Sequence, residues 1–239
     1  MNHEAKLIGR ERLAGDVAIF RFEKPEGFQF FAGQWCFLSV PPAGHQDDKG
    51  LRRPLSIASS PLEKELIFAT KLGDSAMKRT MAEMTPGTSV ALGQPMGTMV
   101  LPKETVTPLV FLAGGIGITP FRSMCLYAAG ARTDHAITLF YSSRTPEETP
   151  FLHDLLRMAE QYSRVSVVIT MTRAPEDPKS WSGPRGRLTA DTIRARCPVW
   201  EKASYCIAGP PAMADAMKES LNALNIPADR IKIELFTGA

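Results

Sequence analysis

The sequence lacks the residue patterns of a metal protein. Its 239 residues include only four cysteines, Cys36, Cys125, Cys197 and Cys206, which are widely scattered and form no C-x-x-C or iron–sulfur spacing. The four histidines do not cluster with acids or cysteines. We therefore expect no metal, reduced thiols in a cytoplasmic protein, and any iron–sulfur centre to lie on another protein.

Long apolar runs and a charge excess of one sign are also missing. No run approaches the ~20 apolar residues that span a bilayer, and the N-terminus has no apolar core of a signal peptide. The net charge of +3 is spread evenly, without a basic stripe. With 44% hydrophobic residues, we expect a soluble monomer of one or two domains that binds no nucleic acid and does not insert into membranes.

The most informative stretch runs from Leu109 to Arg122, with the sequence LVFLAGGIGITPFR. Its apolar start is typical of a buried parallel strand. Three glycines follow within four residues and allow a sharp turn and close approach of a ligand. Pro120 suits the first turn of a helix, whose N–H groups attract anions. The pattern predicts a strand, a phosphate-binding loop and a helix, which together bind a nucleotide cofactor.

The pattern of apolar residues changes near residues 102–108. Before this point apolar runs are short and turns rich in proline and glycine separate them, which favours a small antiparallel β-barrel. The barrel occupies residues 1–104 in this interpretation. We expect its strands at 17–22, 35–40, 66–70 and 89–92, and one helix at 75–84.

After this point strands and helices alternate, which predicts an α/β doubly wound parallel sheet over residues 105–239. The expected strands are 109–113, 136–141, 165–171, 205–208 and 231–236. The expected helices are 120–129, 150–161 and 211–224. Gly130 should end the first helix, and Thr149 and Pro150 should cap and open the second.

Two further motifs carry less information alone. RRPLSIASSP at residues 52–61 places arginines before an extended segment, and arginine pairs bidentately with phosphate. A solvated arginine pair before an edge strand is the alternative. AGPPAM at residues 208–213 either completes the far side of a nucleotide cleft or is simply a strand–helix turn.

Taken in this order and spacing, the motifs resemble those of the ferredoxin–NADP reductase superfamily. Arg53 to Ser56 is similar to its flavin motif Arg-x-Tyr-Ser, and residues 31–35 resemble the strand before it. Gly114 to Pro120 resembles the nicotinamide loop, and Gly209 to Met213 the second nucleotide loop. Residues 234–236 resemble the acidic-x-aromatic end. The resemblance covers nearly the whole chain, from about Leu7 onward.

The resemblance implies roles for matching residues. Arg53 would contact the flavin diphosphate, Ser75 would cap a helix facing it, Thr119 would sit near the nicotinamide, and Phe236 would cover one flavin face. The implied catalytic residues are Ser56, Thr119, Glu234 and Phe236. The implied cofactor-binding residues are Arg53, Pro54, Leu55, Ser56, Ala69, Thr70, Lys71, Ser75, Ala76, Met77, Gly114, Gly115, Ile116, Gly117, Thr119, Pro120, Arg144, Thr172, Arg173, Gly209, Pro210, Pro211, Met213 and Phe236.

Three points stay open at this stage. Leu55 stands where many relatives have tyrosine, which removes an aromatic stack of about 0.5–1.5 kcal/mol. Glu234 shares a strand face with Phe236, and is either an edge residue in water or a partly buried group able to relay a proton. Arg144 and Arg173 each follow a strand end; they either read a 2′-phosphate, which favours NADPH over NADH, or are solvated surface charges.

The resemblance implies a flavoprotein oxidoreductase that binds FAD and takes a hydride from NADPH or NADH. It would pass electrons singly to an external carrier such as a ferredoxin, a flavodoxin or an oxygenase component. The alternatives are a reductase of small acceptors, such as free flavin or ferric chelates, and an electron-relay subunit without its own nucleotide site. The intact glycine-rich loop argues against the relay subunit.

Overall fold

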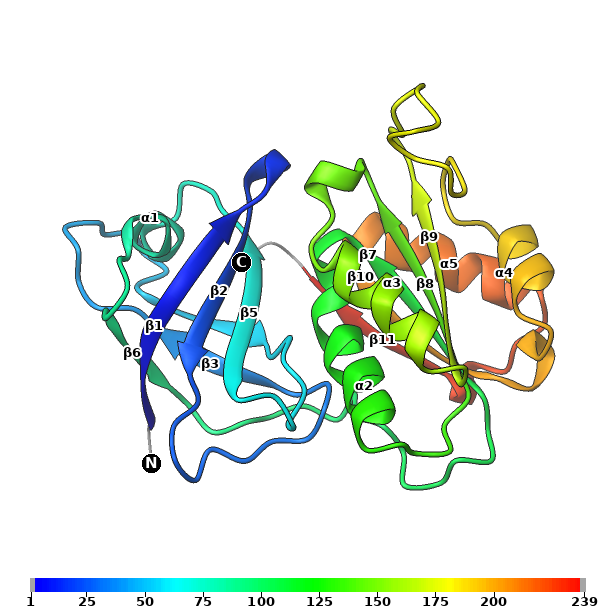
Figure 1. Cartoon of the computed structure of the whole chain (residues 1–239), viewed down its shortest axis with the longest axis horizontal. Coiled ribbons are helices and arrows are strands. Elements are labelled where there is room, and N and C mark those ends of the chain that lie inside the picture. The colour runs from blue at the N-terminus through cyan, green and yellow to red at the C-terminus, as the bar shows by residue number, and fades with distance from the viewer. Residues whose placement is uncertain (1–2, 237–239) are drawn as a thin grey trace.

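The computed structural model describes residues 3–236 and contains two sheets packed side by side (Figure 1). The first is antiparallel and nearly closed, with strand order β4-β3-β6-β1-β2-β5. Its strands are β1 (His3–Arg12), β2 (Val17–Glu23), β3 (Trp35–Ser39), β4 (Arg52–Ser56), β5 (Glu65–Lys71) and β6 (Ser89–Leu92). Helix α1 (Ala76–Glu83) lies between β5 and β6 in the chain. This is the predicted barrel.

The second sheet is parallel, with strand order β11-β10-β7-β8-β9. Its strands are β7 (Leu109–Gly114), β8 (Ile137–Ser143), β9 (Val165–Met171), β10 (Ser204–Gly209) and β11 (Ile231–Leu235). Its helices are α2 (Ile118–Gly130), α3 (Leu152–Gln161), α4 (Ala190–Arg196) and α5 (Pro211–Ala223). Residues 93–108 connect the two sheets. The predicted barrel followed by a doubly wound α/β sheet is confirmed.

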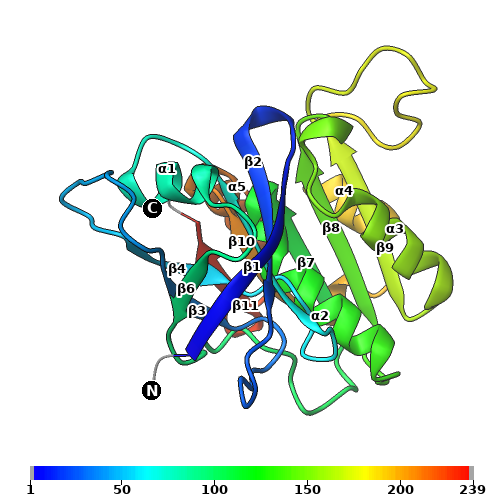
Figure 2. The ribbon, with the colours of Figure 1, turned by 60° about the vertical axis from the view of Figure 1, so that its left-hand side comes forward.

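Alternate residues of β7 enter two different cores, because successive side chains of a strand point to opposite faces. Phe111 packs with residues of α2 and α3, whereas Val110 and Leu112 pack with residues of α4 and α5. The two helix pairs therefore cover opposite faces of the sheet, as Figures 1 and 2 show. Every residue of β7 is buried, which explains its uninterrupted apolar sequence.

The structure differs from the expected elements at three places. Strand β1 was not predicted, because most of its side chains are charged or polar and few are buried. Helix α4 was not predicted, because its seven residues bury only Ile193. The expected cap of α3 is wrong: Phe151, in a left-handed conformation, precedes the helix, and the Thr149 hydroxyl instead donates to the Thr145 carbonyl at 2.6 Å.

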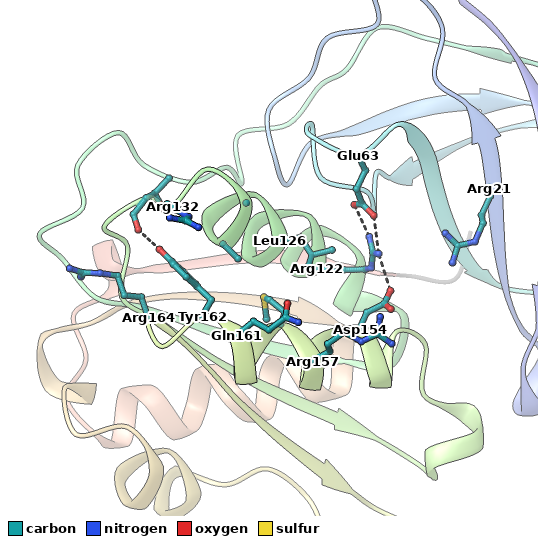
Figure 3. A pocket seen from close by; sticks show the side chains of 14 residues that line it. Arg21, Glu63, Arg122, Leu126, Arg132, Asp154, Arg157, Gln161, Tyr162 and Arg164 are labelled. Atoms are coloured by element: carbon teal, nitrogen blue, oxygen red, sulfur yellow. Dashed lines mark hydrogen bonds and ion pairs between the residues drawn. The ribbon is translucent and has the colours of Figure 1, made fainter.

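Arg122 on α2 joins the barrel to the parallel-sheet domain. Its guanidinium donates to Glu63 of the barrel and to Asp154 of α3 at 3.0–3.1 Å, and to the Ala58 carbonyl at 2.8 Å. Figure 3 shows it between the two carboxylates, beside a cavity of about 950 Å³. The neighbouring Ser123 hydroxyl donates to the Ser59 carbonyl at 2.6 Å. These contacts fix the barrel against α2.

Within residues 3–236, none of the helices is both long and apolar enough to span a bilayer. All four cysteines are buried and unpaired. Burial raises the pKa of Cys36 to about 12 and that of Cys206 to about 11. Both thiols are therefore neutral near pH 7 and pack as apolar groups.

Candidate functional site

A cavity of about 1,010 Å³ lies between the barrel and the parallel sheet. It is lined by the ends of β4 and β5 from the barrel, by the turns after β7, β8 and β10 from the second domain, and by most of β11. The residues predicted from sequence that line it are Pro54, Leu55, Ser56, Ala69, Thr70, Lys71, Gly114, Gly115, Ile116, Arg144, Thr172, Pro210, Met213, Glu234 and Phe236. Segments far apart in the sequence therefore form one site.

The glycine-rich loop sits where the strand order of the parallel sheet reverses. The chain moves from β7 outward to β8 and β9, then returns to place β10 on the other side of β7. In open α/β sheets this reversal marks the ligand crevice. Gly115 has a φ of +52° and open space around it, whereas a Cβ on Gly117 would lie 2.2 Å from the Ala208 carbonyl oxygen. Gly117 thus allows α2 to begin directly against β10.

Ser56 and Glu234 meet in this cavity, although 178 residues separate them. The Ser56 hydroxyl donates to Glu234 Oε1 at 3.5 Å. Burial raises the pKa of the Glu234 carboxyl, and the Ser56 hydrogen bond partly opposes that rise. Glu234 is partly buried at the cavity rather than fully in water, and its role as a proton relay stays a prediction. A carboxyl with a raised pKa beside a hydroxyl is able to hold and release a proton.

Phe236 lines the cavity beside Glu234, and its backbone N–H donates to the Gly209 carbonyl at 3.0 Å. The side chain is half-buried and packs against a core to which both the barrel and the parallel-sheet domain contribute. Leu235 between them also lines the cavity, so the face shared by Glu234 and Phe236 stays a prediction.

Positive charge dominates the cavity. Lys71, Lys78, Arg144 and Lys232 line it, against the carboxylates of Glu148 and Glu234. Burial lowers the pKa of Lys78, and the nearby cations Arg53, Lys49 and Lys71 lower it further. Like charges held together are costly unless an anion joins them. The site therefore suits an anionic ligand such as a phosphorylated cofactor.

Arg53 lies behind the cavity wall rather than in it. It is 6% exposed, and its Nη1 donates to the carbonyls of Lys49, Gly50 and Arg52 at 2.6–3.1 Å. Its Nη2 is buried and has no hydrogen-bond partner within residues 3–236. The Ser75 hydroxyl before α1 is likewise buried without a partner there. Two unsatisfied donors beside a helix N-terminus fit a phosphate group.

Several predicted residues lie outside the cavity lining. Thr119 is buried, and its hydroxyl donates to the Ile116 carbonyl at 3.0 Å, so it stabilises the glycine-rich loop from beneath. Arg173 is exposed beyond the lining. The other predicted residues that do not line the cavity are Arg53, Ser75, Ala76, Met77, Gly117, Pro120, Gly209 and Pro211.

Sequence reasoning missed several lining residues. Lys78 was overlooked because its helix reads as an ordinary amphipathic turn. Residues 97–99 lie in the connection between the two sheets and Gly15 lies in a short 3-10 helix, and neither segment has a motif of its own. Glu148 reaches the cavity because it packs over Gly15 and lies 3.7 Å from Arg144. The acidic pair at 147–148 was the one available signal for this contact.

The comparisons with known proteins agree with this geometry. Residues 111–219 match the family model of the oxidoreductase NAD-binding domain. The chain is 29% identical to ferredoxin–NADP reductase B of Sorangium cellulosum, over 78% of this chain and 75% of that protein. These matches make the chain similar to the ferredoxin–NADP reductase-like FAD/NAD-binding oxidoreductases.

Other similar proteins are larger or were solved with bound cofactors. The reductase component of propane 2-monooxygenase from Rhodococcus jostii is 24% identical over 95% of this chain, which spans 61% of that protein. A ferredoxin NADP+ reductase from Neisseria gonorrhoeae, solved with FAD and NADP, matches with a TM-score of 0.79 and 24% identity. That match covers 100% of this chain and 99% of the other. The ferredoxin–NADP reductase-like fold thus extends over both domains described here.

Proposed function

We propose that this protein is a flavin-dependent NAD(P)H oxidoreductase that passes electrons to an external carrier protein, such as a ferredoxin, a flavodoxin or an oxygenase component. One observation carries the proposal. The flavin motif of β4, the glycine-rich loop after β7 and the Glu234–Phe236 end of β11 line a single cavity of about 1,010 Å³. A site built from both domains brings two cofactors together, which a single-domain site does not.

FAD and NAD(P)H fit this cavity on chemical grounds. Leu55 and Ser56 would lie along the flavin, and Arg53 with the N-terminus of α1 would hold its phosphates. The glycine-rich loop and the turn at 209–211 would hold the pyridine nucleotide. When bound, FAD supplies two-electron chemistry toward nicotinamide and one-electron chemistry toward a carrier.

The chain itself supplies binding, shielding and a proton site. Leu55 gives the cavity an aliphatic wall in place of an aromatic one. Glu234 and Ser56 form a pair that is able to hold a proton inside the cleft. Phe236 lines the cavity and would have to move aside for a nicotinamide stacked on the flavin.

We further propose that Arg144 reads a 2′-phosphate, which favours NADPH. Arg144 lines the cavity and is half-exposed, with Glu148 at 3.7 Å as its ion-pair partner. A phosphate approaching Arg144 would compete with Glu148, whose Oε2 lies 3.7 Å from Arg144 Nη1, beyond hydrogen-bond distance. Arg173 is the second candidate, because its backbone N–H donates to the Arg144 carbonyl at 2.8 Å. Buried, unpaired cysteines support a cytoplasmic location.

Flavin content tests the proposal. The purified chain is expected to be yellow and to release FAD on denaturation. Arg53→Ala removes a charge-assisted phosphate contact worth about 1.5–3 kcal/mol, so the Kd for FAD rises about 10–100-fold. Arg52→Ala is the matched control, because Arg52 is exposed and stacks on Phe37 outside the cavity. A colourless chain that cannot be reconstituted with FAD or FMN overturns the assignment.

A further inference from the structure

Residues 41–50 fold over helix α1 and are tied to both of its ends. Near the helix C-terminus, His45 Nε2 lies 2.9 Å from the Glu83 carboxylate. Near the N-terminus, Asp47 contacts Ala76, the first residue of α1. Arg53 holds the base of the segment by donating to the Lys49 and Gly50 carbonyls. We call residues 41–50 the α1 flap.

The Asp47 carboxylate occupies the N-terminus of α1. Its Oδ2 accepts the Ala76 backbone N–H at 2.6 Å, and its Oδ1 accepts the Lys49 N–H at 2.9 Å. The same Oδ1 lies 3.8 Å from Arg53 Nη2. These backbone bonds, that of Ala76 first, lower the pKa of Asp47, so the carboxylate is ionised near neutral pH. A negative charge at a helix N-terminus is favourable.

We call the Ala76 N–H, Arg53 Nη2 and the Ser75 hydroxyl the anion cradle. The Asp47 carboxylate satisfies this anion cradle only in part. Arg53 Nη2 and the Ser75 hydroxyl remain buried without a hydrogen bond within the described residues. Lys49, Lys71 and Arg53 still act as unfavourable like charges on Lys78. One carboxylate offers two oxygens and a single charge, whereas a phosphate offers more oxygens and more charge. The cradle is therefore built for a larger anion than the one it holds.

We propose that Asp47 is an intramolecular stand-in for a flavin phosphate, and that a phosphorylated flavin binds by displacing Asp47 and the α1 flap from the N-terminus of α1. The inference rests on the proposed flavin site. It makes Asp47 a residue that sets flavin affinity by competing for the Ala76 amide and Arg53. Flavin phosphate and Asp47 cannot accept the Ala76 N–H at once, since that amide is a single donor.

Titrations of the flavin-free full chain test this competition. The substitution Asp47→Asn keeps an amide-binding oxygen but removes the competing charge. The matched control is Asp48→Asn, because Asp48 is exposed and makes no hydrogen bond or ion pair within residues 3–236. Both variants lose one negative charge from the same flap. Quenching of flavin fluorescence gives the Kd of FAD, FMN and riboflavin for each variant.

The expected result is specific to phosphate. Asp47→Asn tightens FAD and FMN by about tenfold, the scale of one charge-assisted hydrogen bond, and leaves riboflavin unchanged. Asp48→Asn changes none of the three. Equal effects of both substitutions, a gain that extends to riboflavin, or weaker FAD binding by Asp47→Asn would overturn the inference.

Inorganic pyrophosphate separates this inference from the proposed function. If Asp47 competes for the cradle, pyrophosphate raises the Tm of Asp47→Asn more than that of the wild type, because a ligand stabilises the state it binds. An equal rise in both overturns the role of Asp47 whatever the flavin does. Failure of the wild type to bind any flavin overturns the proposed function, and the pyrophosphate result still decides the role of Asp47.

Discussion

Replacement of Arg122 by alanine is expected to destabilise the junction between barrel and parallel sheet. Arg122 is 3% exposed, and its guanidinium donates to Glu63, Asp154 and the Ala58 carbonyl. Breaking a buried ion pair costs about 3–5 kcal/mol. The carboxylates of Glu63 and Asp154 are 31% and 37% exposed, so water partly solvates them once the arginine is gone. We therefore expect a loss of about 2–4 kcal/mol.

Urea unfolding of the flavin-free chain, followed by circular dichroism, measures this loss. For an m-value of about 2–3 kcal/mol/M, the midpoint falls by roughly 1 M. The matched control is Arg157→Ala. Arg157 lines the same cavity (Figure 3), but its side chain has no hydrogen bond or ion pair in the described chain. Its expected change is within about 0.5 kcal/mol. Equal midpoints for the two variants would refute the junction role of Arg122.

The remaining predictions concern the cleft. Gly117→Ala places a Cβ 2.2 Å from the Ala208 carbonyl and should raise the KM for NAD(P)H, whereas Gly9→Ala, which meets nothing within 4 Å, should not. Burial raises the folded-state pKa of Glu234, so the folded state binds the extra proton. As the pH rises above about 4.3, the ordinary pKa of a glutamate, the Tm of the wild type should therefore fall relative to that of Glu234→Gln. A difference in Tm between the two proteins that does not change with pH contradicts this. Phe236→Ala should lower both KM and kcat for NAD(P)H and speed reoxidation by oxygen, and a change in Tm alone would reject gating. Arg144→Ala should raise the KM for NADPH and spare NADH, and equal effects on both nucleotides would remove the proposed phosphate contact.

The fold was largely predictable because each domain has a simple local pattern. The apolar run of β7 is continuous since both of its faces are covered by helices, and the bounds of β6 and β9 were predicted to the residue. Strand β1 was missed because it is held by pairing with β2 and β6 rather than by apolar content. The local pattern of apolar residues does not show which strands will pair.

The candidate site was predictable only where its residues belong to motifs. The flavin motif led to Ser56, the glycine-rich loop led to Gly115, and the strand period led to Glu234. Asp47 was missed because it lies in a segment rich in turn residues, and its partner Ala76 is 29 positions away. The role of Arg122 depends on carboxylates 59 and 32 positions away, which a single sequence does not connect.

Anaerobic reduction by a pyridine nucleotide tests the central proposal most directly. The flavin-loaded chain is mixed with NADPH or NADH without oxygen, and the flavin absorbance is followed in a stopped-flow instrument. Our account predicts that at least one nucleotide bleaches the flavin absorbance at a rate no slower than kcat. An added one-electron carrier protein in its oxidised form should then restore the absorbance of the oxidised flavin. A flavin that stays oxidised with both nucleotides would contradict it.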